Sequence, residues 1–439
     1  MNKIQTIKTI SAAIALLFAG AAMAQAPAAA PDPAASDPVA MGWMQGSPPA
    51  ADKTVRWVDG SFYKFPQTRW SFAHWNQLIP SSDVWRGDGK VAALPRAERK
   101  DIAGLSFQPA NGGATMTFEQ ALAANYTDAI VVLHKGRIVY EKYAGAMTPH
   151  TRHIAMSVTK SFFGTLGEML VNEGKLDPGA MVTQYIPELK DSGFGDVTVR
   201  QVMDMTTGIK FSENYADPNA EIWTYVRAGS VLPRPAGYTG PQNFYDFAKT
   251  VQKDPEAAGA FRYQTVNTDV MGWLIRRATN KTVGELLSER IWSRLGTERD
   301  AMIAVDSAGN EFAGGGLILT ARDMARFGEM MRKDGKFNGQ AIIPKAVVDD
   351  IRNGGDRAVF ARAGYATLPG WSYRDMWWIS HDDHGVFAAR GVHGQTIYID
   401  PKAEMVIARF ASAPQAANGV SDPVMLPAFR AVADRLMRR

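Results

Sequence analysis

The chain has 439 residues, of which 46% are hydrophobic, and it contains no cysteine. This length and composition are sufficient for a large core with two or three domains, and the lack of cysteine excludes disulfides and thiolate chemistry. The net charge of +4 at pH 7 comes without a long Lys/Arg run, so the sequence gives no support to nucleic-acid binding.

The N-terminus has the features of a secretory signal. Two lysines precede an apolar run over residues 10–22, and small residues frame a cleavage position after Ala24. The run is too short to span a bilayer comfortably, so we expect no stable membrane span after cleavage, with an uncleaved anchor as the alternative. Residues 1–24 are therefore predicted to be a signal peptide and residues 25–55 an Ala/Pro-rich mobile linker. The mature protein is expected to be periplasmic or secreted.

Strand patterns occur at both ends of the remaining chain. Residues 129–134 are mostly β-branched, and after a Lys-Gly turn residues 137–143 alternate, which predicts a hairpin. Four late runs read as short strands separated by Gly or Asp-Pro: Met376–Ser380, Val386–Arg390, Gln395–Ile399 and Met405–Phe410.

Between these regions the sequence is mainly helical. Three helix starts are marked by capping pairs: Thr198 with Gln201, Thr282 with Glu285, and Thr320 with Asp323. The order of strands, helices and strands predicts an α/β (α+β) fold whose antiparallel sheet is assembled from both chain ends with flanking helices, plus an all-helical inserted domain. We expect residues 56–160 and 360–439 to form this sheet domain, and residues 161–359 a mainly helical inserted domain.

A Ser-x-x-Lys motif at Ser157 and Lys160 is the strongest chemical signal. Residues three apart share a helix face, so the lysine amine can reach the serine oxygen as a candidate base beside a nucleophile. An apolar stripe follows Ser157 at helical spacing, whereas the second copy of the motif, Ser61 to Lys64, is followed by Pro66 and reads as strand or loop. The alternative role for Ser157 is an ordinary helix N-cap.

Partners for this pair must come from elsewhere in the chain. Tyr263 precedes a predicted helix from Thr268 to Ala278 and could share a proton with the lysine, although a half-buried core tyrosine is the alternative. The long Gly/Pro-rich segment 211–245 carries several aromatic residues and is either a binding loop or an ordinary packed excursion.

Other hydrolase signatures are absent from the sequence. The segment His381-Asp382-Asp383-His384 lies between predicted strands rather than on a helix, and no His-Glu-x-x-His motif occurs, so we predict no metal site. No Gly-x-Ser-x-Gly elbow occurs either, which argues against an α/β-hydrolase.

Taken in order, these motifs resemble the serine β-lactamase and penicillin-binding-protein superfamily. The motifs are Ser157-Val158-Thr159-Lys160, Tyr263-Gln264-Thr265, and His384-Gly385-Val386 followed by Gly391-Val392-His393-Gly394-Gln395. Within the superfamily the chain is most similar to the 6-aminohexanoate-dimer hydrolase group and the β-lactamase-fold esterases. The likeness runs from about residue 129 to residue 411 and includes the segment 312–323.

The resemblance implies an acyl-enzyme mechanism with Ser157, Lys160 and Tyr263 as catalytic residues. It also implies that backbone N–H groups of Ser157 and of the strand just after His384 hold the oxyanion. Further residues are expected to bind substrate: Tyr215, Thr265, Asn267, His384, Gly385 and Val386. Two departures from the usual pattern are that Thr265 or Asn267 replaces the Asn or Ser of the second motif, and that His384-Gly385-Val386 replaces Lys-Thr-Gly.

The sequence therefore predicts an exported serine hydrolase that cleaves small-molecule esters or linear amides without metal or organic cofactor. A neutral imidazole holds a carboxylate less well than a lysine, so β-lactam turnover is expected to be poor unless Arg390 compensates. A D-alanyl carboxypeptidase or β-lactamase acting on cell-wall peptides or β-lactams shares the same catalytic residues and stays open. A non-catalytic binding protein of the same fold is the alternative from another class.

Overall fold

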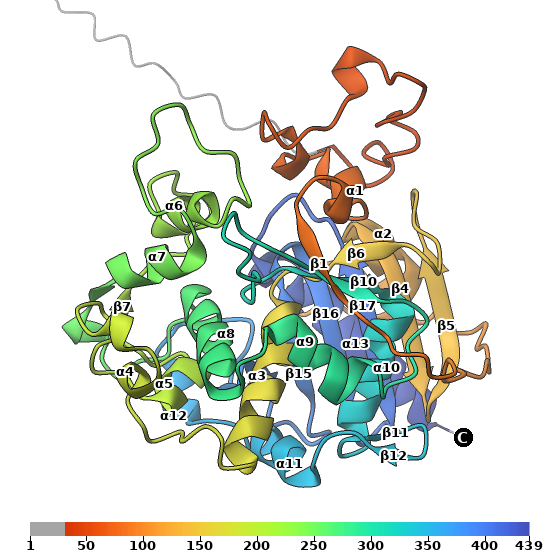
Figure 1. Cartoon of the computed structure of the whole chain (residues 1–439). Coiled ribbons are helices and arrows are strands. Elements are labelled where there is room, and N and C mark those ends of the chain that lie inside the picture. The colour runs from red at the N-terminus through yellow and green to blue at the C-terminus, as the bar shows by residue number, and fades with distance from the viewer. Residues whose placement is uncertain (1–30, 439) are drawn as a thin grey trace, which may run out of the picture. The chain divides into compact units, whose positions relative to one another are not determined.

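A seven-stranded antiparallel sheet lies at the centre of the structure, a computed structural model that describes residues 31–438 (Figure 1). In spatial order its strands are β13 (Ser372–Arg374), β14 (Trp377–Ile379), β15 (Phe387–Gly391), β16 (Gln395–Asp400), β17 (Met405–Ala411), β4 (Thr127–His134) and β5 (Arg137–Tyr143). The early hairpin pairs with β17, so the sheet is assembled from both ends of the chain. The predicted hairpin and the four predicted late strands are confirmed.

The two faces of this sheet bury different helices. Alternate residues of a strand point to opposite faces, and accordingly Val131 belongs to the main hydrophobic core while Ile130 and Val132 belong to a second, smaller one. Helix α10 (Ala321–Arg332) covers the main-core face along β17, β16 and β4. Helices α2 (Phe118–Ala124) and α13 (Asp422–Met437) supply Phe118 and Phe429 to the smaller core.

A helical lobe packs beside the sheet. Its helices are α4 (Val182–Tyr185), α5 (Val199–Met203), α6 (Glu221–Ala228), α7 (Phe244–Thr250), α8 (Val266–Thr279) and α9 (Val283–Leu287), with α11 (Lys345–Asn353) and α12 (Arg357–Ala361) following α10. Thr198 and Thr282 form the predicted capping boxes, and Thr320 accepts the Asp323 N–H at the start of α10. The helix predicted from Thr268 to Ala278 is confirmed as α8.

The segment 161–359 differs from a purely helical insertion. It contributes β9 (Ala301–Ala304) and β10 (Leu317–Thr320) to a second antiparallel sheet with β1 (Ser81–Val84) and β6 (Arg152–Ile154), in the order β1-β9-β10-β6. Three two-stranded ribbons complete the strands: β2 (Ser106–Phe107) with β3 (Met116–Thr117), β7 (Ile209–Lys210) with β8 (Gln252–Lys253), and β11 (Lys336–Phe337) with β12 (Gln340–Ala341). β9 and β10 pair with each other, but their outer partners, β1 and β6, lie far away in sequence, and the short apolar runs did not identify them as strands.

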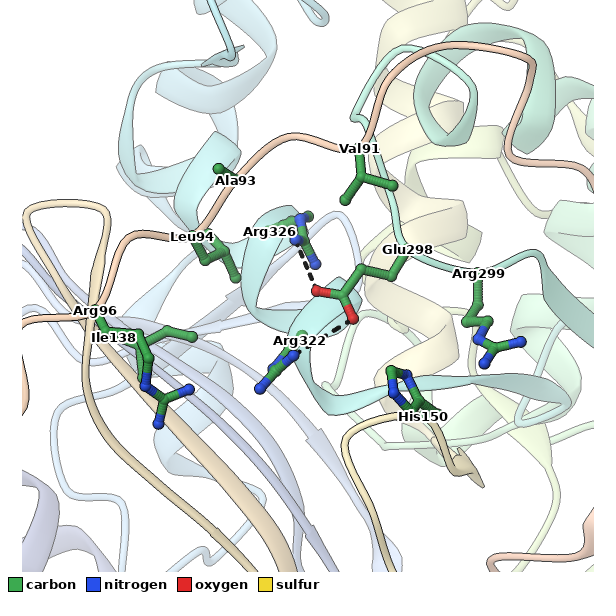
Figure 2. Close-up of a pocket in the computed structure, with 10 residues that line it drawn as sticks. All are labelled: Val91, Ala93, Leu94, Arg96, Ile138, His150, Glu298, Arg299, Arg322 and Arg326. Atoms are coloured by element: carbon green, nitrogen blue, oxygen red, sulfur yellow. Dashed lines mark hydrogen bonds and ion pairs between the residues drawn. The ribbon is translucent and has the colours of Figure 1, made fainter.

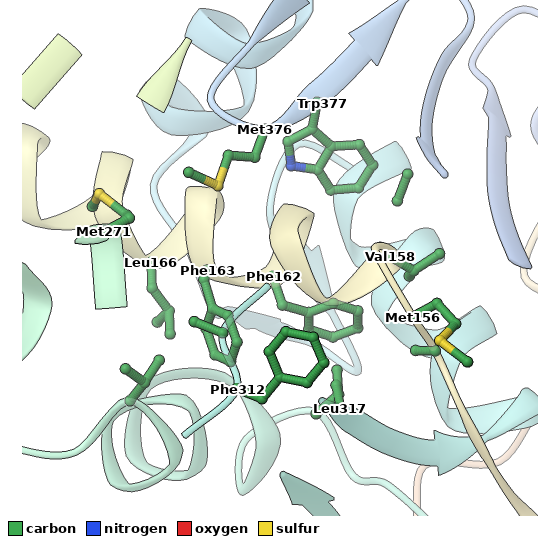
Figure 3. Close-up of a cluster of buried hydrophobic side chains, with 14 of the residues drawn as sticks. Met156, Val158, Phe162, Phe163, Leu166, Met271, Phe312, Leu317, Met376 and Trp377 are labelled. Atoms are coloured by element: carbon green, nitrogen blue, oxygen red, sulfur yellow. The ribbon is translucent and has the colours of Figure 1, made fainter. Parts of the chain in front are cut away.

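Helix α3 (Val158–Asn172) runs through the interior between sheet and helical lobe. Figure 3 shows Phe162, Phe163 and Leu166 of this helix surrounded by side chains from several other elements, among them Met271 of α8 and Trp377 of β14. The helix is buried from Val158 to Leu170, so its first turn, where Ser157 and Lys160 lie, is fixed by packing on all sides.

The N-terminal segment bears on two predictions. Trp43 and Val55, within the predicted linker, are buried in the main core, while about half of residues 31–55 are exposed. The predicted signal peptide, residues 1–24, lies outside the described residues. Within residues 31–438, no helix combines the length and apolar character needed to cross a membrane.

Candidate active site

Ser157 lies at the first turn of α3, directly after the turn that follows β6. Met156 before it has φ of 46°, a left-handed conformation that costs energy for a non-glycine residue and is often found at functional sites. The Ser157 side chain makes no N-cap hydrogen bond, so its hydroxyl is not used to end the helix. The alternative role as a simple cap is therefore not the one that the structure adopts.

Lys160 is directed at Ser157 and is almost fully buried. Its Nζ lies 2.8 Å from Ser157 Oγ and donates a second hydrogen bond, of 2.5 Å, to the Gly314 carbonyl oxygen. Only 1% of the lysine surface is exposed, against 7% for Ser157. The two side chains are within the distance that direct proton transfer requires.

Burial sets the charge state of this lysine. Removal from water disfavours the ammonium form and lowers the Lys160 pKa to about 8, while the nearby carboxyl groups of Glu213 and Asp269 oppose that change. A lysine with this pKa is partly neutral near neutral pH. It can therefore accept a proton from a serine hydroxyl, which an ordinary lysine does rarely.

Asp269 fixes the position of Gly314, the residue whose carbonyl oxygen accepts the hydrogen bond from Lys160. One of its oxygens accepts the Gly314 N–H at 3.2 Å and the other accepts the Tyr225 hydroxyl. Burial raises the Asp269 pKa to about 7, against the influence of Tyr225 and Lys160. Glu213, whose pKa burial also raises, accepts the backbone N–H of Thr265.

Sequence reasoning missed Glu213, Asp269 and Gly314 as members of the site. The only local signals for them were the proximity of Glu213 to Tyr215 and the Gly314-Gly315-Gly316 run. Neither signal indicates contact with Lys160, which depends on the packing of α8 against α3.

Tyr263 is half-buried and faces the same pair. The Lys160 Nζ lies 5.1 Å from the centroid of the tyrosine ring. Burial is the main cause that raises the Tyr263 pKa well above its ordinary value, and the nearby Glu213 carboxyl group raises it further. A hydrogen bond with Ser157 lowers the pKa, but by less. The phenol therefore stays protonated and is suited to pass a proton rather than to act as a free phenolate.

Gly391, the last residue of β15, and Val392, directly after it, are the residues that approach Ser157. A Cβ added to Gly391 would lie 2.9 Å from both the Ala155 oxygen and the Ser157 nitrogen, which shows how closely β15 passes. Val392 lines the cavities on both sides of Ser157. The Ser157 N–H donates to no acceptor within residues 31–438, so it is free to bind an oxyanion together with the Val392 N–H.

The structure does not bring His384, Gly385 and Val386 to this site, which corrects their expected role. The His384 ring is buried and its Nδ1 lies 2.6 Å from Asp400 Oδ2. Val386 is five residues from Gly391 along the strand direction, about 16 Å at the rise of an extended strand. The Gly-Val step that contacts Ser157 is the second one, Gly391-Val392, because it ends the strand at the helix.

Of the remaining expected binding residues, two line the cavities and one does not. Tyr215 packs edge-to-face on Trp223, with ring centroids 5.8 Å apart, and borders both cavities beside Ser157. Thr265 lines one of them. Asn267 is fully buried within α8, and its side-chain nitrogen and oxygen have no hydrogen-bond partner among the described residues.

Ser157 opens into two cavities of different character. A wide chamber of about 500 Å³ is formed by the segments 364–368 and 416–419 together with Glu213, Tyr263 and Trp378. Arg390 and Asp422 in its wall form an ion pair with each other. On the other side of Tyr215 lies a narrow slot of about 40 Å³ whose walls are mainly apolar.

A larger cavity of about 650 Å³ lies elsewhere and carries no nucleophile (Figure 2). Glu298 bridges Arg322 and Arg326 there. Arg322 also pairs with Glu141 and Arg326 with Asp323, so the charges of these two arginines are already compensated. Among the described residues, the one group of three acidic side chains close enough to share a metal is Glu168, Asp350 and Asp375. Arg200 and Arg374 already pair with its carboxylates.

The second Ser-x-x-Lys copy has no such surroundings. Ser61 begins a single 3-10 turn, Ser61–Tyr63, rather than the predicted strand or loop, and its hydroxyl bonds to the backbone of Arg56. No helix carries Lys64 back towards Ser61, so this copy cannot form the pair.

Fold and site define a serine β-lactamase type of hydrolase, and the comparisons with known proteins agree. Residues 117–424 match the family model described as Beta-lactamase, and the chain belongs to that family. It is 34% identical over 377 residues to a 6-aminohexanoate-dimer hydrolase of Paenarthrobacter ureafaciens, covering 85% of this chain and 93% of the relative. The protein is a hydrolase of this superfamily, related to the 6-aminohexanoate-dimer hydrolases.

Solved structures show the same fold. A Bacillus anthracis protein assigned to the 6-aminohexanoate-dimer hydrolases superposes with a TM-score of 0.80 at 32% identity, over 88% of this chain and 98% of that one. EstCE1, a hydrolase with promiscuous acyltransferase activity, superposes with a TM-score of 0.56 at 17% identity, over 72% and 96%. At that identity the second likeness shows the fold alone.

Proposed function

We propose that the protein hydrolyses ester or linear amide bonds through an acyl-enzyme on Ser157. The observation that carries this proposal is the buried Lys160 amine, 2.8 Å from Ser157 Oγ, at the junction of two cavities. A binding module has no use for a lysine whose pKa burial lowers to about 8 beside a serine hydroxyl.

The proposed reaction has two half-reactions, acylation of Ser157 and hydrolysis of the acyl-enzyme. Ser157 Oγ attacks the carbonyl carbon while neutral Lys160 takes its proton, and the Ser157 and Val392 amides hold the oxyanion. The protonated Lys160 and the Tyr263 phenol return a proton to the departing alcohol or amine. Water then attacks the acyl-enzyme along the same route and releases the acid together with free Ser157.

The chamber favours esters and linear amides over β-lactams. The third motif carries no lysine, and the Arg390 guanidinium in the chamber wall is paired with Asp422, so its charge is not free to anchor a β-lactam carboxylate. The Paenarthrobacter ureafaciens relative is named for a dimer of 6-aminohexanoate, whose two units are joined by a linear amide. This relationship supports the linear-amide part of the proposal.

Steady-state kinetics on three substrate types test the proposal. The values of kcat/KM should be higher for p-nitrophenyl esters and for a linear aliphatic p-nitroanilide than for nitrocefin, and Ser157→Ala should abolish all of them. A higher nitrocefin value would favour the β-lactamase or D-alanyl carboxypeptidase alternative. Residual turnover by Ser157→Ala equal to wild type would remove Ser157 from the mechanism.

We further propose that the chain is exported and acts in the periplasm or outside the cell. The support is the order of basic residues, apolar run and small residues at the N-terminus. The mature protein would begin at Gln25, after the apolar run of residues 10–22.

A further inference from the structure

The turn over residues 391–394, which follows β15, is held through its carbonyl oxygens by side chains of residues outside it. Three such hydrogen bonds join Asn418 Nδ2 to Gly391 at 3.0 Å, Gln395 Nε2 to Val392 at 3.2 Å and Arg409 Nη1 to Gly394 at 2.8 Å. A peptide group of this turn cannot rotate without breaking one of these bonds. The orientation of its N–H groups is therefore set by other parts of the chain.

Asn418 binds the peptide group that carries one of the two oxyanion donors. The Gly391 carbonyl and the Val392 N–H belong to the same peptide, which is trans. In a trans peptide the C=O and N–H bonds point in opposite directions. A donor that holds the carbonyl oxygen on one side therefore fixes the direction of the N–H on the other side.

The segment that carries Asn418 follows the end of β15 in the opposite direction. Three contacts join the two stretches: Ala416 O with the His393 N–H at 3.0 Å, Asn418 with Gly391, and Asp422 with Arg390 at 2.5 Å. Asn418 also accepts the Ser421 N–H through its own carbonyl oxygen, at 2.9 Å. Since α13 begins at Asp422 and packs in the smaller core, Asn418 lies on a segment anchored at both ends.

Fold stability does not account for an amide at position 418. The nitrogen must face Gly391, because an amide oxygen there would meet another acceptor. The remaining Oδ1 is buried and has no hydrogen-bond partner among residues 31–438. A buried acceptor without a partner lowers stability, and such residues are expected where a side chain serves a functional site.

We propose that Asn418 is a positioning residue that orients the Gly391–Val392 peptide so that the Val392 N–H donates to the oxyanion. This inference rests on the proposed function, because the peptide needs that orientation only if an oxyanion forms at Ser157. Asn418 acts through the peptide and does not itself contact the reacting atoms. Its side chain also borders the chamber, so a direct contact with substrate is the role that the experiments must separate from positioning.

Three variants of Asn418 separate hydrogen bonding from packing. Asn418→Ala removes the donor and the volume, Asn418→Leu removes the donor but keeps the branched shape, and Asn418→Gln keeps an amide. We expect kcat on p-nitrophenyl acetate to fall about tenfold in Ala and Leu, less than for a deleted oxyanion donor because the Val392 N–H is still present. The Gln variant should stay within about threefold of wild type.

The split between kcat and KM identifies the step that is affected. An interaction that strengthens only in the transition state lowers kcat and leaves KM within about twofold. The pH at which kcat/KM rises should not move in any variant, because Glu213 and Asp269, and not Asn418, influence the Lys160 pKa. A shifted profile would show a general disturbance of the site and would overturn the specific role.

A boronic acid reports on the oxyanion position without turnover. Ser157 Oγ adds to the boron of n-propylboronic acid, the serine proton passes to Lys160, and no group leaves, so the adduct is tetrahedral and anionic. Its Kd, measured by titration calorimetry, should rise about tenfold in Asn418→Ala and Asn418→Leu, by the same factor as kcat falls. The Kd of Asn418→Gln should stay within about threefold of wild type.

Controls distinguish this inference from the proposed function. Val420→Ala, at a side chain 64% exposed in the same 3-10 turn, should change neither kcat nor Kd. Loss of acetate hydrolysis in Ser157→Ala tests the proposed function by itself. Wild-type kcat and Kd in Asn418→Leu would refute the positioning role while the hydrolase proposal stands, and a raised KM with unchanged kcat would make Asn418 a substrate contact instead.

Discussion

Gly391→Ala tests whether β15 completes the site at Ser157. The new Cβ would lie 2.9 Å from the Ala155 oxygen and from the Ser157 nitrogen, about 0.5 Å inside ordinary contact distance. Both are backbone atoms, so neither can rotate away, and the strand must separate from Ser157 by several tenths of an ångström. That movement displaces the Val392 amide from the oxyanion position.

The expected cost follows from this displacement. A shift approaching 1 Å at a reacting group costs about 10²-fold, and loss of one oxyanion donor costs about 10²- to 10³-fold. Because Gly391→Ala moves the donor without deleting it, we expect kcat on p-nitrophenyl acetate to fall between about tenfold and 10²-fold. Overpacking should also lower the free energy of unfolding by about 1–3 kcal/mol.

Two glycine controls isolate the effect. Gly104→Ala adds a methyl group in open space and should change neither kcat nor Tm. Gly385→Ala strains a residue with φ of 66°, so Tm should fall while kcat stays within about twofold of wild type. Full kcat in Gly391→Ala, combined with a large loss in Gly385→Ala, would return the third motif to residues 384–386.

Further predictions concern protons and the N-terminus. The kcat/KM for esters should rise with pH through about 8, since the Lys160 base works only when neutral, and a flat profile from pH 6 to 9 would contradict that role. Asp269→Asn removes a negative charge that favours the ammonium, so the rise should move about one unit to lower pH; an unmoved profile would show no coupling. Lys160→Ala and Tyr263→Phe should each lower kcat about 10²-fold or more in the same assay, and near-normal turnover would remove that residue from the scheme. Mass spectrometry of the secreted protein should find Gln25 as first residue, and retention of residues up to Ala24 would disprove cleavage there.

The sequence predicted the strands that have a clear local pattern and missed short strands that only pairing with distant strands defines. The β-branched run over 129–134, the alternation over 137–143 and the four late runs predicted β4, β5 and β14 to β17. Most of these strands are buried on both faces, so they appear in the sequence as short, nearly continuous apolar runs. The runs that became β9 and β10 are four residues long, and each has one partner, β1 or β6, that lies far away in sequence. No local signal identifies such pairing.

The candidate site was likewise predicted in part: the Ser157–Lys160 pair was found and the third motif was misplaced. Ser157 and Lys160 share one helical turn, so spacing alone suggested that they meet, whereas Tyr263 was placed with them only by the family resemblance. The third element was misplaced because the sequence offers two similar Gly-Val steps, at residues 385 and 391, one at each end of β15. Which end of β15 reaches Ser157 is decided by how the strand packs on α3.

Sequence reasoning could not identify the carboxyl groups that influence the Lys160 pKa. Glu213 comes from the loop after β7 and Asp269 from the first turn of α8, and each affects Lys160 through space rather than through a motif. Trp43 shows the converse case, since the composition around it predicted a spacer while one side chain ties the segment to the core.

The most direct test of the account is to identify the residue that becomes acylated or phosphonylated. A fluorophosphonate probe should add one label per molecule, and tryptic peptide mapping should place it on Ser157, with Ser157→Ala left unlabelled. Lys160→Ala should label much more slowly because the hydroxyl loses its base. A label on another serine, or equal labelling of wild type and Ser157→Ala, would contradict the central claim that Ser157 is the nucleophile.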